Sequence, residues 1–354
     1  MEKEKNKNGL VTILVIIILV LAVLCALFAT GTINFKPKEE TIKYTPNIEQ
    51  HDFTDGEIKA RLVRLSSNGI PQNSETTYNG ITVKVEEKGS EYTLFINNKD
   101  VTNEVINMYI SEYEIYDNNV IIYSGSTNNG KITIFHVQNG NVETVFNKSY
   151  IDGYKLDSFK TENNKIILTS VECGEQCGDN YTENRFASFE MEYQNSKFTE
   201  PKKVNTIKSK FVDVFEDDET SETTFNKMTV KYTKEENAIK LQINDKDITS
   251  ELGNINMYIK SYEFYDNYII VFSGSTNNLG LTVFKVNDTN VEKTFQSHTI
   301  NDYRIESYYS RYGRLIIKGK ECGEQCGKKL TGKTYATFEM KYNNETFSNP
   351  VLAD

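Results

Sequence analysis

Apolar and polar residues alternate with a period of two through most of the chain that follows residue 80. Ile81–Val85, Lys131–Val137 and Phe186–Met191 alternate in this way or run apolar over the length of a strand. Residues that tolerate positive φ separate such runs, as expected where strands reverse. These turn residues are Asn118-Asn119, Asn128-Asn129-Gly130, Asn139-Gly140 and Asp152-Gly153. No amphipathic helical pattern competes, so the pattern predicts an all-β fold.

The chain contains two copies of one unit. Short segments of the first copy recur 149 residues later in the second, and identical sequence at constant spacing indicates an internal duplication. The matching segments are Asn107–Ile110 with Asn256–Ile259, Ser124–Asn129 with Ser273–Asn278, and Cys173–Gly178 with Cys322–Gly327. We therefore predict copy 1 at residues 55–203 and copy 2 at residues 204–354.

A weaker period divides each copy into three units. In copy 1 a strand is expected after each of Asn79-Gly80, Asn118-Asn119 and Asn163-Asn164. Units of roughly 45–55 residues match the four-stranded blade of a propeller, and six of them would close a ring. The pattern thus favours a six-bladed β-propeller. The alternative is two tandem β-sandwich-like domains joined near Lys202–Lys210.

The N-terminal segment is apolar enough to cross a membrane. Leu10–Phe28 is almost continuously aliphatic, and no charged residue lies between Lys7 and Lys36. A cleavable signal peptide is disfavoured, because Leu27-Phe28-Ala29 lacks the small residues of a cleavage site. We predict a cytosolic tail at residues 1–8, a transmembrane helix at 9–33 and a polar stalk at 34–54.

The orientation in the membrane follows from the cysteines. Because three lysines lie on each flank of the apolar segment, the positive-inside rule favours neither orientation. The four cysteines beyond Cys25 form two close pairs, which suit an oxidising exterior. Cys25 could indicate lipidation, but bulky Leu24 precedes it and a small apolar filler explains it. We predict a single-pass protein of the cell membrane with a cytoplasmic N-terminus, an extracytoplasmic bulk, and membrane lipid as the partner of its helix.

Composition and charge exclude some functions. The 354 residues include 22 Tyr and 19 Phe, a globular composition that is too aromatic for a disordered chain. The formal net charge of -10 repels phosphate backbones. Nucleic acid is therefore not an expected partner.

The sharpest motif is Cys-Gly-Glu-Gln-Cys-Gly, which occurs once in each copy. Its glycines let the backbone bring two sulfurs together, and so short a disulfide loop stabilises the fold by roughly 2 kcal/mol. We predict the pairs Cys173–Cys177 and Cys322–Cys326. A four-cysteine zinc site and thiol redox chemistry remain alternatives, although no helix is expected beside the cysteines to lower a thiol pKa.

The identical Ser-Gly-Ser-Thr-Asn-Asn loops are candidate binding loops. Their hydroxyl and amide groups could bind a glycan or a peptide backbone, whereas a hairpin connector would explain the same turn formers. The candidate residues are Ser124, Ser126, Thr127, Asn128, Ser273, Ser275, Thr276 and Asn277. A protein or a glycan is the expected ligand.

Carboxylates and histidines give no catalytic set. Acidic residues such as Glu216–Glu219, Asp117 with Asp266, and Asp100 with Asp247 could serve a glycosidase or bind calcium, but solvated loops explain them. His51, His136 and His298 are not paired, and His136 matches Lys285 of copy 2, which predicts an exposed side chain. We assign no catalytic residue, metal ligand or cofactor.

A repeated β platform without a convergent catalytic set is typical of a binder. The sequence thus favours a membrane-anchored, extracytoplasmic and non-enzymatic binding or scaffolding module. One alternative is an extracytoplasmic hydrolase that acts on glycan or peptide with carboxylates from different loops. Another is a structural subunit of a cell-envelope complex.

Overall fold

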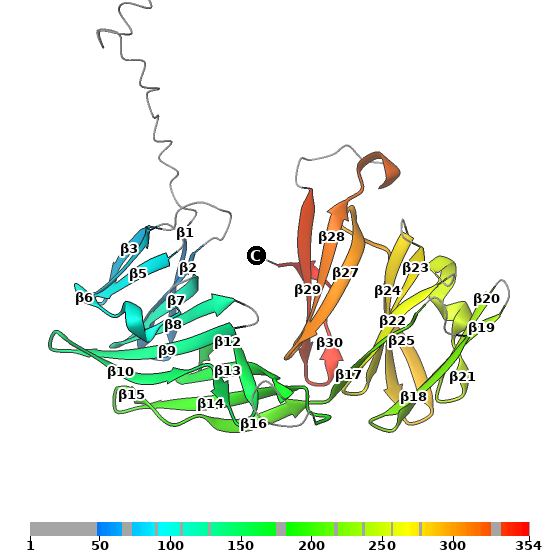
Figure 1. Ribbon diagram of the computed structural model, residues 1–354, viewed down its shortest axis with the longest axis horizontal. Coiled ribbons are helices and arrows are strands. Elements are labelled where there is room, and N and C mark those ends of the chain that lie inside the picture. The colour runs from blue at the N-terminus through cyan, green and yellow to red at the C-terminus, as the bar shows by residue number, and fades with distance from the viewer. Residues whose placement is uncertain are drawn as a thin grey trace, which may run out of the picture. The chain divides into compact units, whose positions relative to one another are not determined.

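Antiparallel strands dominate the computed structural model, as the alternating pattern predicts (Figure 1). It describes residues 48–65, 73–88, 91–106, 109–126, 129–174, 182–215, 219–235, 238–255, 258–275, 278–326 and 334–353. The helical elements within these ranges are short 3-10 turns, such as Thr102–Glu104 and Thr249–Ile255. The three strands predicted from alternation lie within β4, β9 and β14, so these predictions are confirmed.

Copy 1 forms three sheets. The first inserted sheet has the order β3-β4-β5-β6, the first central sheet β1-β2-β7-β8-β9-β10, and the first outer sheet β11-β12-β13-β14-β15, with β16 also on β14. Their strands are β1 Ile48–Asp55, β2 Ile58–Leu65, β3 Ser74–Tyr78, β4 Ile81–Lys88, β5 Glu91–Ile96, β6 Lys99–Asp100, β7 Ile110–Tyr116, β8 Asn119–Ser126, β9 Asn129–Gln138, β10 Asn141–Lys148, β11 Tyr150–Ile151, β12 Tyr154–Glu162, β13 Lys165–Glu172, β14 Phe186–Gln194, β15 Lys197–Phe198 and β16 Lys202–Ile207.

Copy 2 forms three corresponding sheets. The second inserted sheet is β18-β19-β20-β21, the second central sheet β17-β22-β23-β24-β25, and the second outer sheet β26-β27-β28-β29-β30, with β31 also on β29. Their strands are β17 Ser209–Asp213, β18 Thr220–Phe225, β19 Met228–Glu235, β20 Ala238–Ile243, β21 Lys246–Asp247, β22 Ile259–Tyr265, β23 Tyr268–Ser275, β24 Asn278–Asn287, β25 Asn290–Ser297, β26 Thr299–Ile300, β27 Tyr303–Arg311, β28 Arg314–Glu321, β29 Tyr335–Asn343, β30 Thr346–Phe347 and β31 Val351–Leu352.

Strand pairing recurs at the same spacing as the sequence. Ala60 pairs with Tyr116 in copy 1, and Ser209 pairs with Tyr265 in copy 2, each 149 residues further on. The register shift in β7 between Ile110 and Glu112 recurs in β22. Because the bulge recurs at the same register in both copies, it belongs to the backbone conformation that the two copies share.

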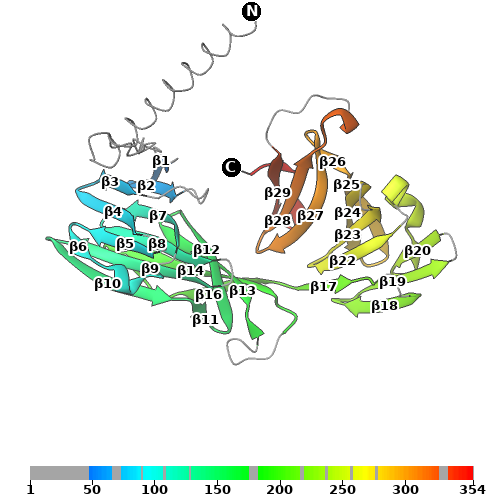
Figure 2. The same ribbon diagram turned by 45° about the horizontal axis from the view of Figure 1, so that its top comes forward.

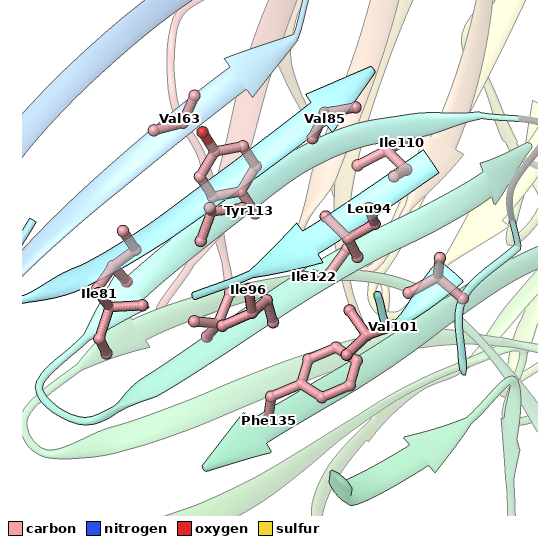
Figure 3. Packing of buried hydrophobic residues seen from close by; sticks show 14 of the residues in the cluster. Val63, Ile81, Val85, Leu94, Ile96, Val101, Ile110, Tyr113, Ile122 and Phe135 are labelled. Atoms are coloured by element: carbon pink, nitrogen blue, oxygen red, sulfur yellow. The ribbon is translucent and has the colours of Figure 1, made fainter. Parts of the chain in front are cut away.

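Each inserted sheet interrupts a central sheet. β2 pairs with β7, so the chain leaves the first central sheet after β2, forms β3 to β6, and returns. Buried side chains of the inserted sheet pack on one face of the central sheet (Figure 3). Leu94 and Ile96 of β5 belong to the same buried cluster as Tyr113 of β7 and Phe135 of β9. The opposite face of the same central sheet packs against the outer sheet.

The reversals use left-handed residues where the sequence predicts most of them. Asn139 and Gly140 have φ of 52° and 78°, and Asp152 and Gly153 have φ of 48° and 79°, as a two-residue hairpin turn requires. The turn predicted at Asn118-Asn119 is wrong by one residue. β8 already begins at Asn119, and Asp117 takes the positive φ because its short polar side chain tolerates that region as asparagine does.

Two predicted connections contain strand. β1 begins at Ile48, within the range expected to be a stalk, and pairs with β2 along its whole length. β1 shows little alternation because consecutive side chains from Glu49 to Asp52, which point to both faces of the sheet, are exposed. The junction expected near Lys202–Lys210 is likewise occupied by β16 and β17.

All described residues belong to one compact unit, Pro46–Asp354. Across these residues, no helix has the length and apolar character needed to cross a membrane. The predicted transmembrane helix at residues 9–33 lies outside the described ranges.

Candidate functional site

The described part of the chain contains a large polar cavity. Its volume is about 1670 Å³, and it is lined by residues of the first central, first outer and second outer sheets together with Asp266 from the β22–β23 turn of the second central sheet. Eight carboxylates and four basic side chains are among the lining residues, which disfavours anionic ligands. The carboxylates are Glu49, Glu112, Glu114, Asp157, Glu190, Asp266, Glu339 and Glu345, and the basic residues are Arg64, Lys160, Arg314 and Lys341.

Two of these carboxylates lie on one face of β7. Glu112 and Glu114 are two residues apart in a strand, and side chains at this spacing share a face. Glu114 is only 2% exposed, and its Oε1 accepts a 2.5 Å hydrogen bond from Thr161 Oγ1. Burial raises the pKa of Glu114 to about 8, so this carboxyl is mostly protonated at neutral pH.

Glu112 differs from Glu114 in its neighbours. Burial also raises its pKa, but the guanidinium groups of Arg64 and Arg314 oppose the shift. Arg64 Nε lies 3.6 Å from Glu112 Oε2. The cavity therefore holds one proton-bearing carboxyl and one carboxyl whose charge is partly compensated.

Asp157 of β12 is the third notable carboxylate. Its residue is 7% exposed, and one of its oxygens, Oδ1, forms an ion pair with Arg311. The other oxygen, Oδ2, is buried and has no hydrogen-bond partner among the described residues. A buried acceptor without a partner is costly, and it marks a place where a ligand or a water can donate.

The acidic pattern of β7 is only half repeated in copy 2. Glu263 occupies the position of Glu114, and Ser310 occupies that of Thr161. Glu263 Oε1 accepts hydrogen bonds from Ser209 Oγ at 2.6 Å and from Ser310 Oγ at 2.5 Å, and burial raises its pKa. Copy 2 has Ser261 in place of Glu112, and Glu263 is not among the residues that line the cavity.

The predicted binding loops fall into two groups. Ser124 and Ser273 are fully buried, so their hydroxyls do not face solvent, and Ser124 Oγ accepts a hydrogen bond from Ile106 N. Ser275 is partly exposed at the end of β23. Thr127, Asn128, Thr276, Asn277 and the side chain of Ser126 lie outside the described residues.

Cys173 and Cys322 occupy equivalent positions and are both disulfide-bonded. Each sulfur lies 2.9 Å from a turn carbonyl oxygen, that of Gly153 for Cys173 and that of Asp302 for Cys322. Cys177 and the side chain of Cys326 lie outside the described residues, so the pairs Cys173–Cys177 and Cys322–Cys326 remain a prediction.

The prediction of an exposed His136 is wrong. Its side chain is buried, and its Nδ1 lies 3.2 Å from Asn119 Oδ1. In copy 2 the same two positions hold Lys285 and Tyr268, both of which donate to the carbonyl oxygen of Glu345. The prediction failed because Asn119, the partner of His136, is also replaced in copy 2, so Lys285 has different neighbours.

Most of the acidic residues named from the sequence accept hydrogen bonds at or near turns. Asp100 Oδ1 and Asp247 Oδ1 accept hydrogen bonds from Thr102 N and Thr249 N. Asp117 and Asp266 accept hydrogen bonds from tyrosine hydroxyls, those of Tyr193 and Tyr342. No cluster of three potential metal ligands occurs in the described ranges, and Glu216–Asp218 lie outside them.

Sequence reasoning missed Glu112, Glu114 and Asp157 as a group. Glu114 had a detectable signal, because it interrupts the apolar run Tyr113–Tyr116 of β7 and recurs as Glu263. A charged residue within a strand that is otherwise apolar is unusual enough to suggest a special environment. Asp157 carries no such signal, since its role depends on residues far away in the chain.

No family model and no curated protein matches the sequence. Among solved structures, AtxE2 isopeptidase has 8% identity over 86% of this chain and 52% of its own, with a TM-score of 0.22. An uncharacterized protein of Listeria monocytogenes has 16% identity, 79% and 83% coverage and a TM-score of 0.23. TolB of Acinetobacter baumannii has 11% identity, 87% and 79% coverage and a TM-score of 0.21. The chain thus spans about half the length of the isopeptidase.

Proposed function

We propose that the chain is a membrane-anchored, extracytoplasmic binding module, and that its ligand occupies the polar cavity. The observation that carries this proposal is Asp157, a residue of the cavity lining whose buried Oδ2 has no hydrogen-bond partner among the described residues. A donor group of a ligand would satisfy this oxygen, which the described residues leave without a partner.

The ligand class follows from the lining. Carboxylates outnumber basic groups, so an anionic ligand is repelled, whereas hydroxyl or ammonium groups find acceptors. Tyr123 and Tyr312 add aromatic surface with polar tips. We propose a neutral or amino-bearing oligosaccharide, which offers many donors and no negative charge. A basic peptide is the competing ligand.

Calorimetric titration of the full chain in detergent with panels of neutral oligosaccharides, amino-bearing oligosaccharides and basic peptides tests the proposal. We expect Asp157→Ala to weaken binding of the accepted ligand at least about tenfold, as loss of a buried charged acceptor does. Glu306→Gln is the matched control, because Glu306 takes the position of Asp157 in copy 2 and does not line the cavity. Binding to anionic glycans only, or unchanged binding by Asp157→Ala, would contradict the proposal.

A second function has its own support in the β7 carboxyls. The Cα atoms of residues two apart on a strand lie about 6.5–7 Å apart, so two side chains that extend in parallel can hold their carboxyl groups at the separation of about 6.5–9.5 Å that inverting glycosidases use. Glu114, with its pKa of about 8, would donate a proton, and the carboxylate form of Glu112, which Arg64 and Arg314 favour against the effect of burial, would activate water. Hydrolysis of an oligosaccharide that Glu114→Gln abolishes and Glu263→Gln preserves would favour this function over simple binding.

For the architecture we propose a propeller-like arrangement of six blades. Six antiparallel sheets and the face-to-face packing of inserted, central and outer sheets support it. The pairing of β2 with β7 departs from blades that are uninterrupted meanders. Two tandem β domains, each a stack of three sheets, remain the alternative.

A further inference from the structure

The two central sheets end differently. In copy 1, β1 covers the outer edge of β2 along eight residue pairs. In copy 2, β17 corresponds to β2, but it is the last strand of the second central sheet as far as the described residues extend (Figure 2). The repeat thus shows that this sheet position accepts a further antiparallel strand, and the described residues of copy 2 leave it open.

The direction of the backbone groups in β17 follows from its bonds to β22. Asp266 N donates to Lys208 O, and Val214 N donates to Lys260 O, so the even-numbered residues face β22. Phe211 and Asp213 therefore direct their N–H and C=O groups away from the sheet. Ser209 N donates to Glu183 O, which closes one end of the edge.

The same edge carries apolar surface. Phe211, at the centre of β17, is 40% exposed, and Phe215, just beyond the strand, is 68% exposed. Phe211 lies on the face of the sheet that carries Glu263, with its ring centroid 6.3 Å from that of Tyr308. An open strand edge with an exposed aromatic residue at its centre is a site for pairing with another strand.

We propose that β17 is a self-association surface, and that a second copy of this chain adds its own β17 to the edge. Two identical antiparallel edges are related by a two-fold axis, so one pairing satisfies both copies and closes the assembly as a dimer. Centring the axis on Phe211 gives reciprocal backbone hydrogen bonds between the two Phe211 residues and places the aromatic rings side by side.

Charge favours this register over its neighbour. With the axis at Phe211, Lys210 lies opposite Val212 of the second copy, and Asp213 lies beside the end of the edge at Ser209, whose N–H already donates to Glu183 O, so the reciprocal backbone hydrogen bonds are those of the Phe211 pair. Moving the axis to Asp213 would place two carboxylates directly opposite each other, which is destabilising. The distance between the two Phe211 residues therefore distinguishes this register from the register centred on Asp213.

Sedimentation velocity and oxidative cross-linking of the full chain in detergent test the dimer, both in a Cys25→Ser background that removes the thiol of the apolar segment. We expect a concentration-dependent dimer, which Phe211→Lys weakens at least about tenfold by removing apolar contact and by placing two charges together. Tyr150→Lys is the matched control, since Tyr150 is 45% exposed on another short edge strand, β11. Phe211→Cys is expected to cross-link, because directly paired residues lie about 5.5 Å apart, whereas Lys210→Cys is not.

Three outcomes would overturn the proposal. The first is a monomer at every concentration with no cross-link at residue 211. The second is a dimer that Phe211→Lys leaves intact, which would mean that another surface or the apolar segment holds it. The third is an open series of oligomers instead of a closed dimer, which would mean that β17 pairs with a different strand.

Discussion

The two copies place the same carboxyl in different surroundings. Glu114 lines the polar cavity and accepts a hydrogen bond from one hydroxyl, whereas Glu263 is enclosed by protein and accepts from two. Both side chains are almost completely buried, and burial raises both pKa values. The shared part of the design is therefore a neutral buried acid, and the part that differs is access to the cavity.

The largest predicted effect is a loss of stability with rising pH. An unfolded glutamate loses its proton near pH 4.5, whereas folded Glu114 keeps its proton until about pH 8. The folded state thus binds more protons in this window, and rising pH lowers the free energy of unfolding by up to about 1.4 kcal/mol per pH unit for each such carboxyl. Glu114→Gln should remove its share of this slope, as measured by urea unfolding between pH 5 and 8.

Glu263→Gln tests whether the enclosed carboxyl of Glu263 contributes to the pH dependence of stability in the same way as Glu114. Gln retains an oxygen that accepts the serine hydrogen bonds, so the fold should survive, and the double variant should show the flattest dependence on pH. A slope that neither substitution changes would show that other groups carry the pH dependence.

The two copies also differ in the residues that pack where β8 and β9 of copy 1, or β23 and β24 of copy 2, lie side by side. In copy 1, Tyr123 lies against Gly130, where an added Cβ would stand 2.8 Å from the ring carbon Cε2. In copy 2 the equivalent residues are Phe272 and Leu279. The glycine thus makes room for the tyrosine ring, and the phenylalanine permits a larger neighbour.

This comparison predicts a coupled substitution. Gly130→Leu should lower the free energy of unfolding by about 1–3 kcal/mol, because it forces an overpacked contact. Adding Tyr123→Phe should recover part of that loss. A double-mutant cycle from denaturant unfolding gives the interaction energy. Additive effects of the two substitutions would contradict the steric explanation.

Much of the fold could be predicted from the sequence, because its signals are local. Alternation located β4, β9 and β14, and turn residues such as Asn139-Gly140 located reversals that their positive φ values confirm. The pairing of β2 with β7 could not be predicted, since it depends on contacts across an inserted sheet. The cavity was missed for the same reason, because Asp157 and Arg311 are 154 residues apart in the sequence and meet only in the folded chain.

The smallest predicted effect is the cost of substituting Lys285, which occupies the position of His136 in copy 2. His136 is buried beside Asn119, so His136→Ala leaves a buried amide oxygen without this partner and should cost about 1–3 kcal/mol. Lys285 donates to the carbonyl oxygen of Glu345 from an exposed position, so Lys285→Ala should cost less than about 1 kcal/mol. Thermal unfolding of the two variants side by side measures the difference, and equal costs would contradict it. A larger cost at residue 136 follows because water can replace a partner at the surface and cannot reach one inside the sheet.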